Sequence, residues 1–282
     1  MDRRIVINAD DFGLCEGVNK AVLKAYTDGV LTSTTIMVNM PAAEEAVEIA
    51  KKLPTLSVGV HLNLTEGKPV SKDACVECLL DADGNFTYSP AKLSVLSIAR
   101  GKIRGAIAAE FAAQIQWVID RGLAPTHLDS HKHIHSFPVI FSIVCQLAKR
   151  FEIPAIRFTF EPKQLCQRPW PLPSEGGKKR AAKVRAMAKI NRFQNPDFLK
   201  TDAFFGIAHT GKIDVSFFKA LALYSSAQTA EVMTHPGFID GLDPTETRLV
   251  RQRQTELEAL CSERTKQYFK DAGIKLVHYG EL

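Results

Sequence analysis

Residues 5–26 read IVINADDFGLCEGVNKAVLKAY, and this stretch sets the expected fold class. Residues 5–9 form a short β-rich run, whereas residues 18–26 carry apolar side chains at helical spacing. A strand that leads directly into a helix predicts a β/α unit, in which the next strand runs parallel to the first. The opening of the chain therefore favours an α/β protein.

The same alternation continues along the rest of the sequence. We expect further strands over residues 34–38, 57–64, 126–129, 155–160, 201–207, 231–234 and 275–279. We expect helices over residues 41–53, 107–119, 138–151 and 246–271, together with a basic helix that ends at Arg192. About six to eight β/α units predict a closed or distorted β/α barrel, and an open doubly wound sheet is the alternative.

The composition excludes several classes of protein. The 282 residues are 45% hydrophobic, and 36 basic against 31 acidic residues give a formal net charge of +5. This excess is too small to predict a nucleic-acid partner, which requires a basic tail or groove. No apolar stretch is long enough to span a bilayer, and no signal peptide follows Met1. We expect a cytoplasmic protein without a membrane partner.

The cysteines are scattered along the sequence, and only Cys75 and Cys78 form a C-x-x-C pair. A second pair that would complete a four-cysteine zinc site is absent. We interpret the pair as ordinary thiols, and reduced thiols agree with a cytoplasmic location.

Two segments interrupt the alternation of strands and helices. Residues 70–90 are mostly polar, and residues 162–200 are rich in Pro, Gly and basic side chains, including Lys178-Lys179-Arg180. We interpret both as insertions in a single domain that covers residues 1–282. Long loops of this kind often shape a substrate pocket. The basic helix is expected to be a solvated face, with a phosphate or nucleic-acid contact as the alternative.

Two adjacent aspartates, Asp10 and Asp11, directly follow the first strand. Neighbouring carboxylates repel one another unless a cation or hydrogen bonds compensate their charge. One of them could instead cap the following helix, which leaves the other without an obvious partner.

Histidines end three more of the expected strands. His61 follows Val58-Gly59-Val60, and His131 belongs to His127-Leu128-Asp129-Ser130-His131-Lys132-His133-Ile134-His135. His235 precedes Pro236-Gly237, a turn signal. Each histidine alone has an ordinary alternative as a core or loop residue. Together, however, two Asp and at least three His from four strand ends could converge on one edge of a parallel barrel, where a His/His/Asp metal set supports hydrolysis.

Four motifs resemble those of the YdjC-like deacetylases, and within that family those of the bacterial chitooligosaccharide deacetylases: Asn8-Ala9-Asp10-Asp11-Phe12-Gly13, Val60-His61-Leu62, Thr126-His127-Leu128-Asp129-Ser130-His131 and Met233-Thr234-His235-Pro236. The likeness runs from residue 4 to about residue 157 and resumes at residue 231. It implies a distorted β/α barrel related to the NodB-like architecture of polysaccharide deacetylases.

The resemblance also implies roles for individual residues. Asp11, His61 and His131 would hold one divalent metal ion, with Mg favoured by the resemblance and Zn, Mn or Co as alternatives. Asp10 would act as general base, steadied by Arg157, and His235 as general acid. His127, Asp129 and His133 are expected to support the ligands.

The same resemblance implies a substrate class. The metal-dependent reaction would remove acetyl groups from N-acetylated sugars such as chitobiose. Alternatives are hydrolysis of another acylated or phosphorylated small molecule and a non-catalytic carbohydrate-binding protein. A homodimer is the assembly that we consider.

Overall fold

The computed structural model of the chain describes residues 3–168, 170–194, 198–240, 242 and 247–282. Its strands form one parallel sheet in the order β5-β4-β3-β2-β1-β7-β6, and β8 pairs with the amino-terminal half of β1. The strands are β1 Arg3–Phe12, β2 Ser33–Ile36, β3 Ser57–Leu62, β4 His127–Ser130, β5 Ala155–Ile156, β6 Ala203–Phe205, β7 Thr229–Thr234 and β8 Ile274–Leu276.

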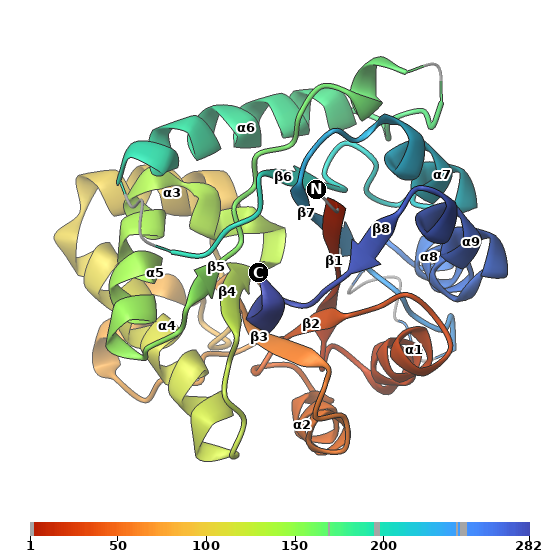
Figure 1. The fold of residues 1–282 in the computed structure, drawn as a ribbon. Coiled ribbons are helices and arrows are strands. Elements are labelled where there is room, and N and C mark those ends of the chain that lie inside the picture. Colours follow the sequence, from red (N-terminus) through yellow and green to blue (C-terminus); the bar gives the residue numbers. More distant parts are fainter. Residues whose placement is uncertain (1–2, 169, 195–197, 241, 243–246) are drawn as a thin grey trace.

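Helices surround this sheet as a ring, and both ends of the chain lie near its centre (Figure 1). The helices are α1 Glu16–Thr27, α2 Ala43–Lys51, α3 Pro90–Ala99, α4 Gly101–Asp120, α5 Pro138–Arg150, α6 Gly177–Gln194, α7 Val215–Tyr224, α8 Arg251–Cys261 and α9 Glu263–Asp271. Because helices cover the outer face, β1, β2 and β3 are buried along almost their whole length.

The sheet curls until its two edges approach one another. Beyond β5 the backbone continues to Phe160, whose carbonyl accepts a hydrogen bond of 3.0 Å from the Phe204 backbone N–H in β6. This contact is sparse compared with the ladders elsewhere in the sheet, so the barrel is distorted. The α/β fold with a distorted β/α barrel is therefore confirmed, and the open doubly wound alternative is wrong.

Several expected elements differ from the sequence prediction. Strands β5 and β6 are shorter than the expected ranges 155–160 and 201–207, and α4 begins before the expected residue 107. The helix predicted over residues 246–271 is two helices, because Ser262 leaves the helical conformation and its Oγ accepts the backbone N–H of Arg264 to cap α9. Residue 246 itself lies outside the described residues. The strand predicted over residues 275–279 is shorter, since β8 ends at Leu276 and a 3-10 helix, η4 Tyr279–Glu281, follows it.

Two helices were not predicted. Ser89 caps α3, with Pro90 in its first turn, and Asp214 caps α7. The polar segment before α3 contains a 3-10 helix, η1 Ala74–Leu79, and the buried Glu110 carboxylate of α4 anchors it by accepting the backbone N–H groups of residues 70 and 71. The basic helix α6 is present as predicted, with Arg192 in its last turn.

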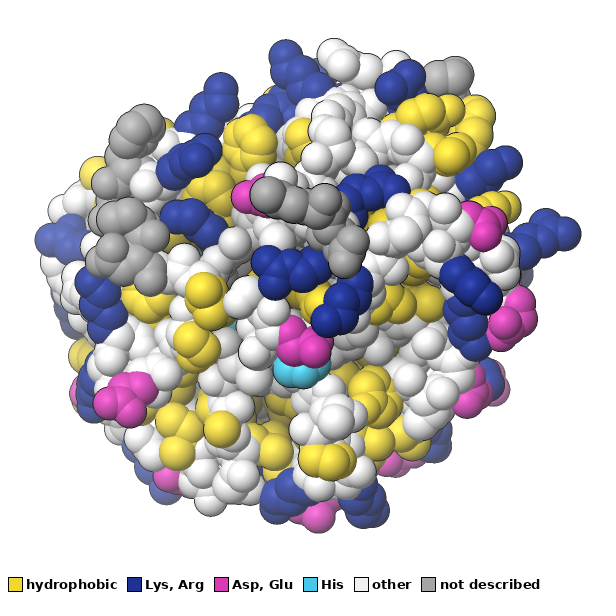
Figure 2. Space-filling view, viewed as in Figure 1, with side chains coloured by type: hydrophobic (Ala, Val, Ile, Leu, Met, Phe, Trp, Pro, Cys, Tyr) yellow, Lys and Arg dark blue, Asp and Glu magenta, His cyan; other side chains and the backbone are white. Residues whose placement is uncertain are grey.

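The charged side chains on one face of the molecule give no sign of a particular partner. On the face seen in Figure 2, Lys and Arg side chains are dispersed with Asp and Glu among them rather than gathered in one stripe. Within the described ranges, no helix combines the length and the apolar character needed to cross a membrane. All six cysteines are free thiols.

Candidate functional site

The carboxyl ends of β1, β3, β4 and β7 meet around one cavity of about 860 Å³. Its lining includes all five residues that the sequence placed at strand ends: Asp10, Asp11, His61, His131 and His235. Both insertions contribute to its walls, through residues 86–90 and Arg180. The expected convergence of these side chains on one edge of the sheet is therefore observed.

A local break in β1 lets two consecutive aspartates face the same cavity. Side chains of successive strand residues normally point to opposite faces. Asp11 has a φ of 67°, and the register between β1 and β2 shifts between Ala9 and Phe12. Asp tolerates this left-handed conformation better than most residues, and such an irregularity re-aims a side chain. The strand thereby presents both carboxylates at one place.

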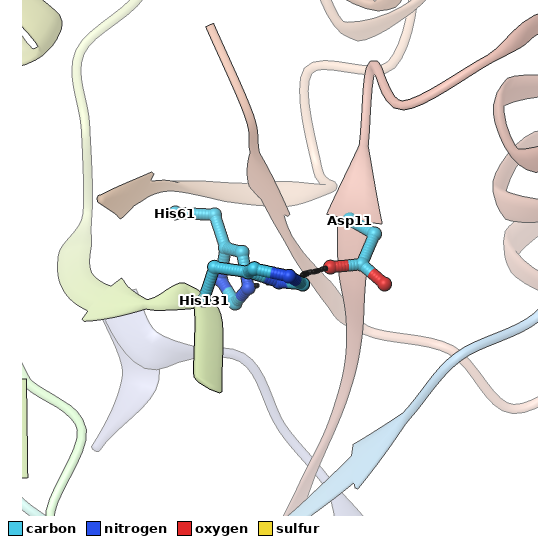
Figure 3. A group of neighbouring side chains, drawn as sticks. All are labelled: Asp11, His61 and His131. Carbon is cyan, nitrogen blue, oxygen red and sulfur yellow. Dashed lines mark hydrogen bonds and ion pairs between the residues drawn. The ribbon is translucent and has the colours of Figure 1, made fainter. Parts of the chain in front are cut away.

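Asp11, His61 and His131 lie close together in this cavity and form a candidate metal site (Figure 3). Asp11 Oδ1 lies 3.4 Å from His61 Nε2 and 3.2 Å from His131 Nδ1. One ligand atom from each residue lies within 4.8 Å of the others. Two imidazole nitrogens and a carboxylate oxygen at these separations can hold a divalent cation such as Zn, Mn, Co or Mg.

Asp129 and Thr35 fix the orientation of the His61 ring. His61 Nδ1 lies 2.8 Å from Asp129 Oδ1 and 3.1 Å from Thr35 Oγ1. The opposite nitrogen, Nε2, therefore faces Asp11. A histidine held by a carboxylate through its other nitrogen is typical of metal sites.

The electrostatics of this cluster favour a positive charge. Burial opposes protonation of His61, yet the carboxylates of Asp129, Asp10 and Asp11 raise its pKa to about 10. The pKa of His131 is also raised, because Asp11 and Glu66 outweigh its burial. The carboxylates around the two histidines stabilise a positive charge, which a bound divalent cation would supply in place of the protons. The residues thus fit the metal that the sequence implied.

Asp10 lies beside the cluster and pairs with Arg157 through both carboxylate oxygens. Arg157 Nη1 donates to Oδ2 at 2.7 Å, and Nη2 donates to Oδ1 at 2.6 Å. Asn8 Nδ2 adds a hydrogen bond of 2.9 Å to Oδ1. Burial raises the pKa of Asp10, but the Arg157 guanidinium outweighs burial and holds this pKa well below its ordinary value. Asp10 is therefore an ionised carboxylate in a fixed orientation.

His235 reaches the cavity from the end of β7. Its backbone N–H donates to Glu256 Oε2 at 2.6 Å, and its Nδ1 lies 3.8 Å from the same oxygen. The imidazole is 11% exposed, so it can meet a molecule in the cavity while Glu256 remains behind it. A histidine in this position can donate a proton to a bound substrate.

The remaining histidines of the cluster around His131 have separate environments. His133 lines the cavity, with a φ of 52°. His135 Nδ1 lies 2.6 Å from Ser130 Oγ. His127 is absent from the described cavity lining, and its ring stacks on Tyr279 at 3.7 Å.

Sequence reasoning missed three charged residues of the site. Arg253 Nη2 donates to Asp11 Oδ2 at 2.5 Å, and Glu256 supports His235 from the next turn of α8. Glu66 Oε1 lies 3.3 Å from His131 Nε2 and 2.7 Å from Lys132 Nζ. Arg253 and Glu256 stand in a run of polar residues typical of an exposed helix, so their burial gave no signal in the sequence.

Comparisons with known proteins identify relatives of this chain. The family model for YdjC-like proteins matches residues 4–271. A carbohydrate deacetylase of Geobacillus stearothermophilus is 36% identical over 282 residues, covering 100% of this chain and 99% of the relative. A carbohydrate deacetylase of Brevibacillus brevis is 33% identical over 279 residues, covering 99% of both chains.

A solved structure shares the fold. The crystal structure of a candidate cellobiose-phosphate cleavage protein from Enterococcus faecalis V583 superposes with a TM-score of 0.78 at 25% identity. It covers 100% of this chain and 99% of its own. The likeness therefore extends over the whole barrel, including both insertions.

Proposed function

We propose that this chain, which belongs to the family of YdjC-like proteins, is a metal-dependent carbohydrate N-deacetylase. The observation that carries the proposal is the clustering of Asp11, His61 and His131 beside Asp10 and His235 in one cavity. The relatives named as carbohydrate deacetylases support the same substrate class. The single domain over residues 1–282, the cytoplasmic location and the homodimer stay predictions.

The residues of the cavity divide the work of amide hydrolysis. A divalent cation held by Asp11, His61 and His131 would supply Lewis-acid chemistry, polarising a carbonyl and lowering the pKa of water. Asp10, which Arg157 holds in orientation, would accept the proton of the attacking water. His235 would give a proton to the sugar nitrogen as the amide bond breaks. Acetate and an amino sugar are the products.

Acetate release from N-acetylated sugars tests the proposal. N-Acetylglucosamine, chitobiose and longer chitooligosaccharides are incubated with protein loaded separately with Mg, Zn, Mn or Co. We expect acetate from at least one sugar, with a chitooligosaccharide such as chitobiose preferred, and release that is slower by about two to four powers of ten from Asp10→Asn.

Asp28→Asn is the matched control, because Asp28 pairs with Lys24 on the surface at 2.6 Å. It should keep the wild-type rate. Absence of acetate from every sugar with every metal would contradict the proposed function.

Hydrolysis of a phosphorylated small molecule is the second candidate. Its support is the positive charge that remains in the cavity. The carboxylates of Asp10, Asp11 and Glu66 each form an ion pair with a basic side chain. Two further basic residues, Arg180 and Arg248, line the cavity wall. The solved relative named for cellobiose-phosphate cleavage points in the same direction. Release of phosphate rather than acetate from phosphorylated sugars would favour this alternative.

A further inference from the structure

Arg157 is shared by three buried carboxylates. Its Nη1 and Nη2 hold Asp10, while Nη1 also lies 2.7 Å from Asp129 Oδ2. On the remaining edge, Nε donates to Glu231 Oε1 at 2.8 Å, and Nη2 lies 2.8 Å from the same oxygen. Arg157, Asp129 and Glu231 are all 0% exposed. The orientation of this guanidinium is therefore decided entirely by its protein neighbours.

Glu231 is held in turn by Tyr279. The Tyr279 hydroxyl donates to Glu231 Oε2 at 2.5 Å, and the residue is 1% exposed. Its ring stacks on His127 with an interplanar angle of 12°. His127 packs so closely against Gly59 that a Cβ added there would lie 2.6 Å from the imidazole. The tyrosine therefore rests on a surface that cannot easily shift.

We propose that Glu231 and Tyr279 are positioning residues for the base, acting on Asp10 through Arg157. The inference rests on the proposed function. A bidentate Arg–carboxylate pair requires the guanidinium plane to match the carboxylate. Asp129 contacts Nη1 of the guanidinium, whereas Glu231 contacts Nε and Nη2. Loss of the Glu231 contact therefore lets Arg157 turn toward Asp129. Asp10 then loses its orientation toward the proton that it must accept.

The tyrosine hydroxyl matters because Glu231 has no contact with solvent. Burial raises the pKa of Glu231 to about 7, against the opposing influence of Arg157 and Tyr279. Arg157 Nε–H and Tyr279 O–H are both donors, which is the environment of an ionised, acceptor-only carboxylate. Without the hydroxyl, Glu231 is more readily protonated and its hold on Arg157 weakens.

Tyr279→Phe and Glu231→Gln test the inference in metal-loaded protein. Tyr279→Phe keeps the ring on His127 and deletes only the hydroxyl. We expect kcat to fall by about 10-fold to 100-fold in both variants, the range observed when an outer partner of a site is removed. KM and metal affinity should stay at wild-type values, since neither residue lines the described cavity. Tyr26→Phe is the matched control, because it deletes a tyrosine hydroxyl bonded to Thr55 instead.

A measurement that does not depend on turnover accompanies these assays. In protein labelled with ¹⁵N-arginine, the buried Arg157 Nε–H should exchange slowly with solvent in the wild type and faster in both variants. Wild-type kcat together with unchanged exchange in Tyr279→Phe would overturn the inference, as would a loss of activity matched by loss of metal. If the wild type releases no acetate, the proposed function fails, and the exchange measurement still decides whether Tyr279 and Glu231 hold Arg157.

Discussion

The two sides of the cavity are built differently. On the side of the base, Arg157 contacts Asp10, Asp129 and Glu231 at 2.6–2.8 Å. On the side of the acid, His235 Nδ1 stands 3.8 Å from Glu256. Within the part of the chain that the structure describes, buried nitrogens of His235 and Arg253 have no hydrogen-bond partner.

This difference matches what the two proton transfers require. A base that collects a proton from water needs one fixed orientation, which its bidentate pair with Arg157 supplies. An acid must follow the substrate nitrogen as it changes geometry, and a group with free hydrogen-bonding capacity can do so. Buried polar groups without partners are costly, so we expect the acid side to gain hydrogen bonds when the sugar binds.

The largest effect should come from the cluster between the two sides. His61→Ala and His131→Ala each remove a nitrogen ligand, so tight metal binding and turnover should be lost together. Metal content after dialysis and acetate release are measured on the same samples. Asp28→Asn, a substitution of the surface residue that pairs with Lys24, should keep both. Full metal occupancy in both ligand variants would refute the assignment.

Asp10→Asn and His235→Ala compare the base side with the acid side directly. Each should retain the metal and lose about two to four powers of ten in turnover, as expected for a proton-transfer group. Only His235→Ala should lose the alkaline limb of the pH–rate profile, because that limb reports deprotonation of the acid. Near-wild-type turnover of metal-loaded His235→Ala would place the acid elsewhere, with His133, which also lines the cavity, as the next candidate.

Glu256→Gln should have a smaller effect and sharpen the contrast. The amide oxygen can still accept the His235 backbone N–H, while the negative charge behind the imidazole disappears. We expect kcat to fall by about 10-fold or less. A loss as large as that of His235→Ala would show that the acid side is as tightly organised as the base side.

The smallest effect concerns His127 and the pH dependence of the free energy of unfolding. Burial holds the pKa of His127 well below its ordinary value of 6.5, so the folded protein binds fewer protons there than the unfolded chain. Its contribution to stability is present above about pH 6.5 and is lost as the pH falls below that value. Urea unfolding between pH 7 and 5 should show a slope against pH that is smaller in His127→Gln, by up to about 1.4 kcal/mol per pH unit. Equal slopes would contradict a neutral, buried His127.

The sequence predicted those site residues that lie at the carboxyl ends of strands. Asp10, Asp11, His61, His131 and His235 could be placed on one edge of the sheet because parallel strands share the direction of their carboxyl ends. The alternation of strands and helices predicted this convergence, but not the break in β1 at Asp11 that turns both aspartates toward the cavity. Arg157 was found through its family resemblance, and the structure places it against Asp10.

The residues that support this set were harder to find. Glu231 lies within β7, where a charged residue gives no sign of whether its partner is solvent or a buried arginine. Arg253 and Glu256 belong to a helix that begins with a run of polar residues, and only tertiary packing shows that they point inward. The break at Ser262 was also missed, since the residues on both sides of it are helical.

The ion pair between Asp11 and Arg253 also has a consequence for folding. It joins residues 242 positions apart, and the Asp10–Arg157 pair spans 147 positions. Contacts of such high sequence separation form slowly, because a large loop must close before they contribute any stability. During refolding, helical circular dichroism should therefore return before metal binding does. Recovery of the metal site would then report completion of the barrel rather than its first collapse.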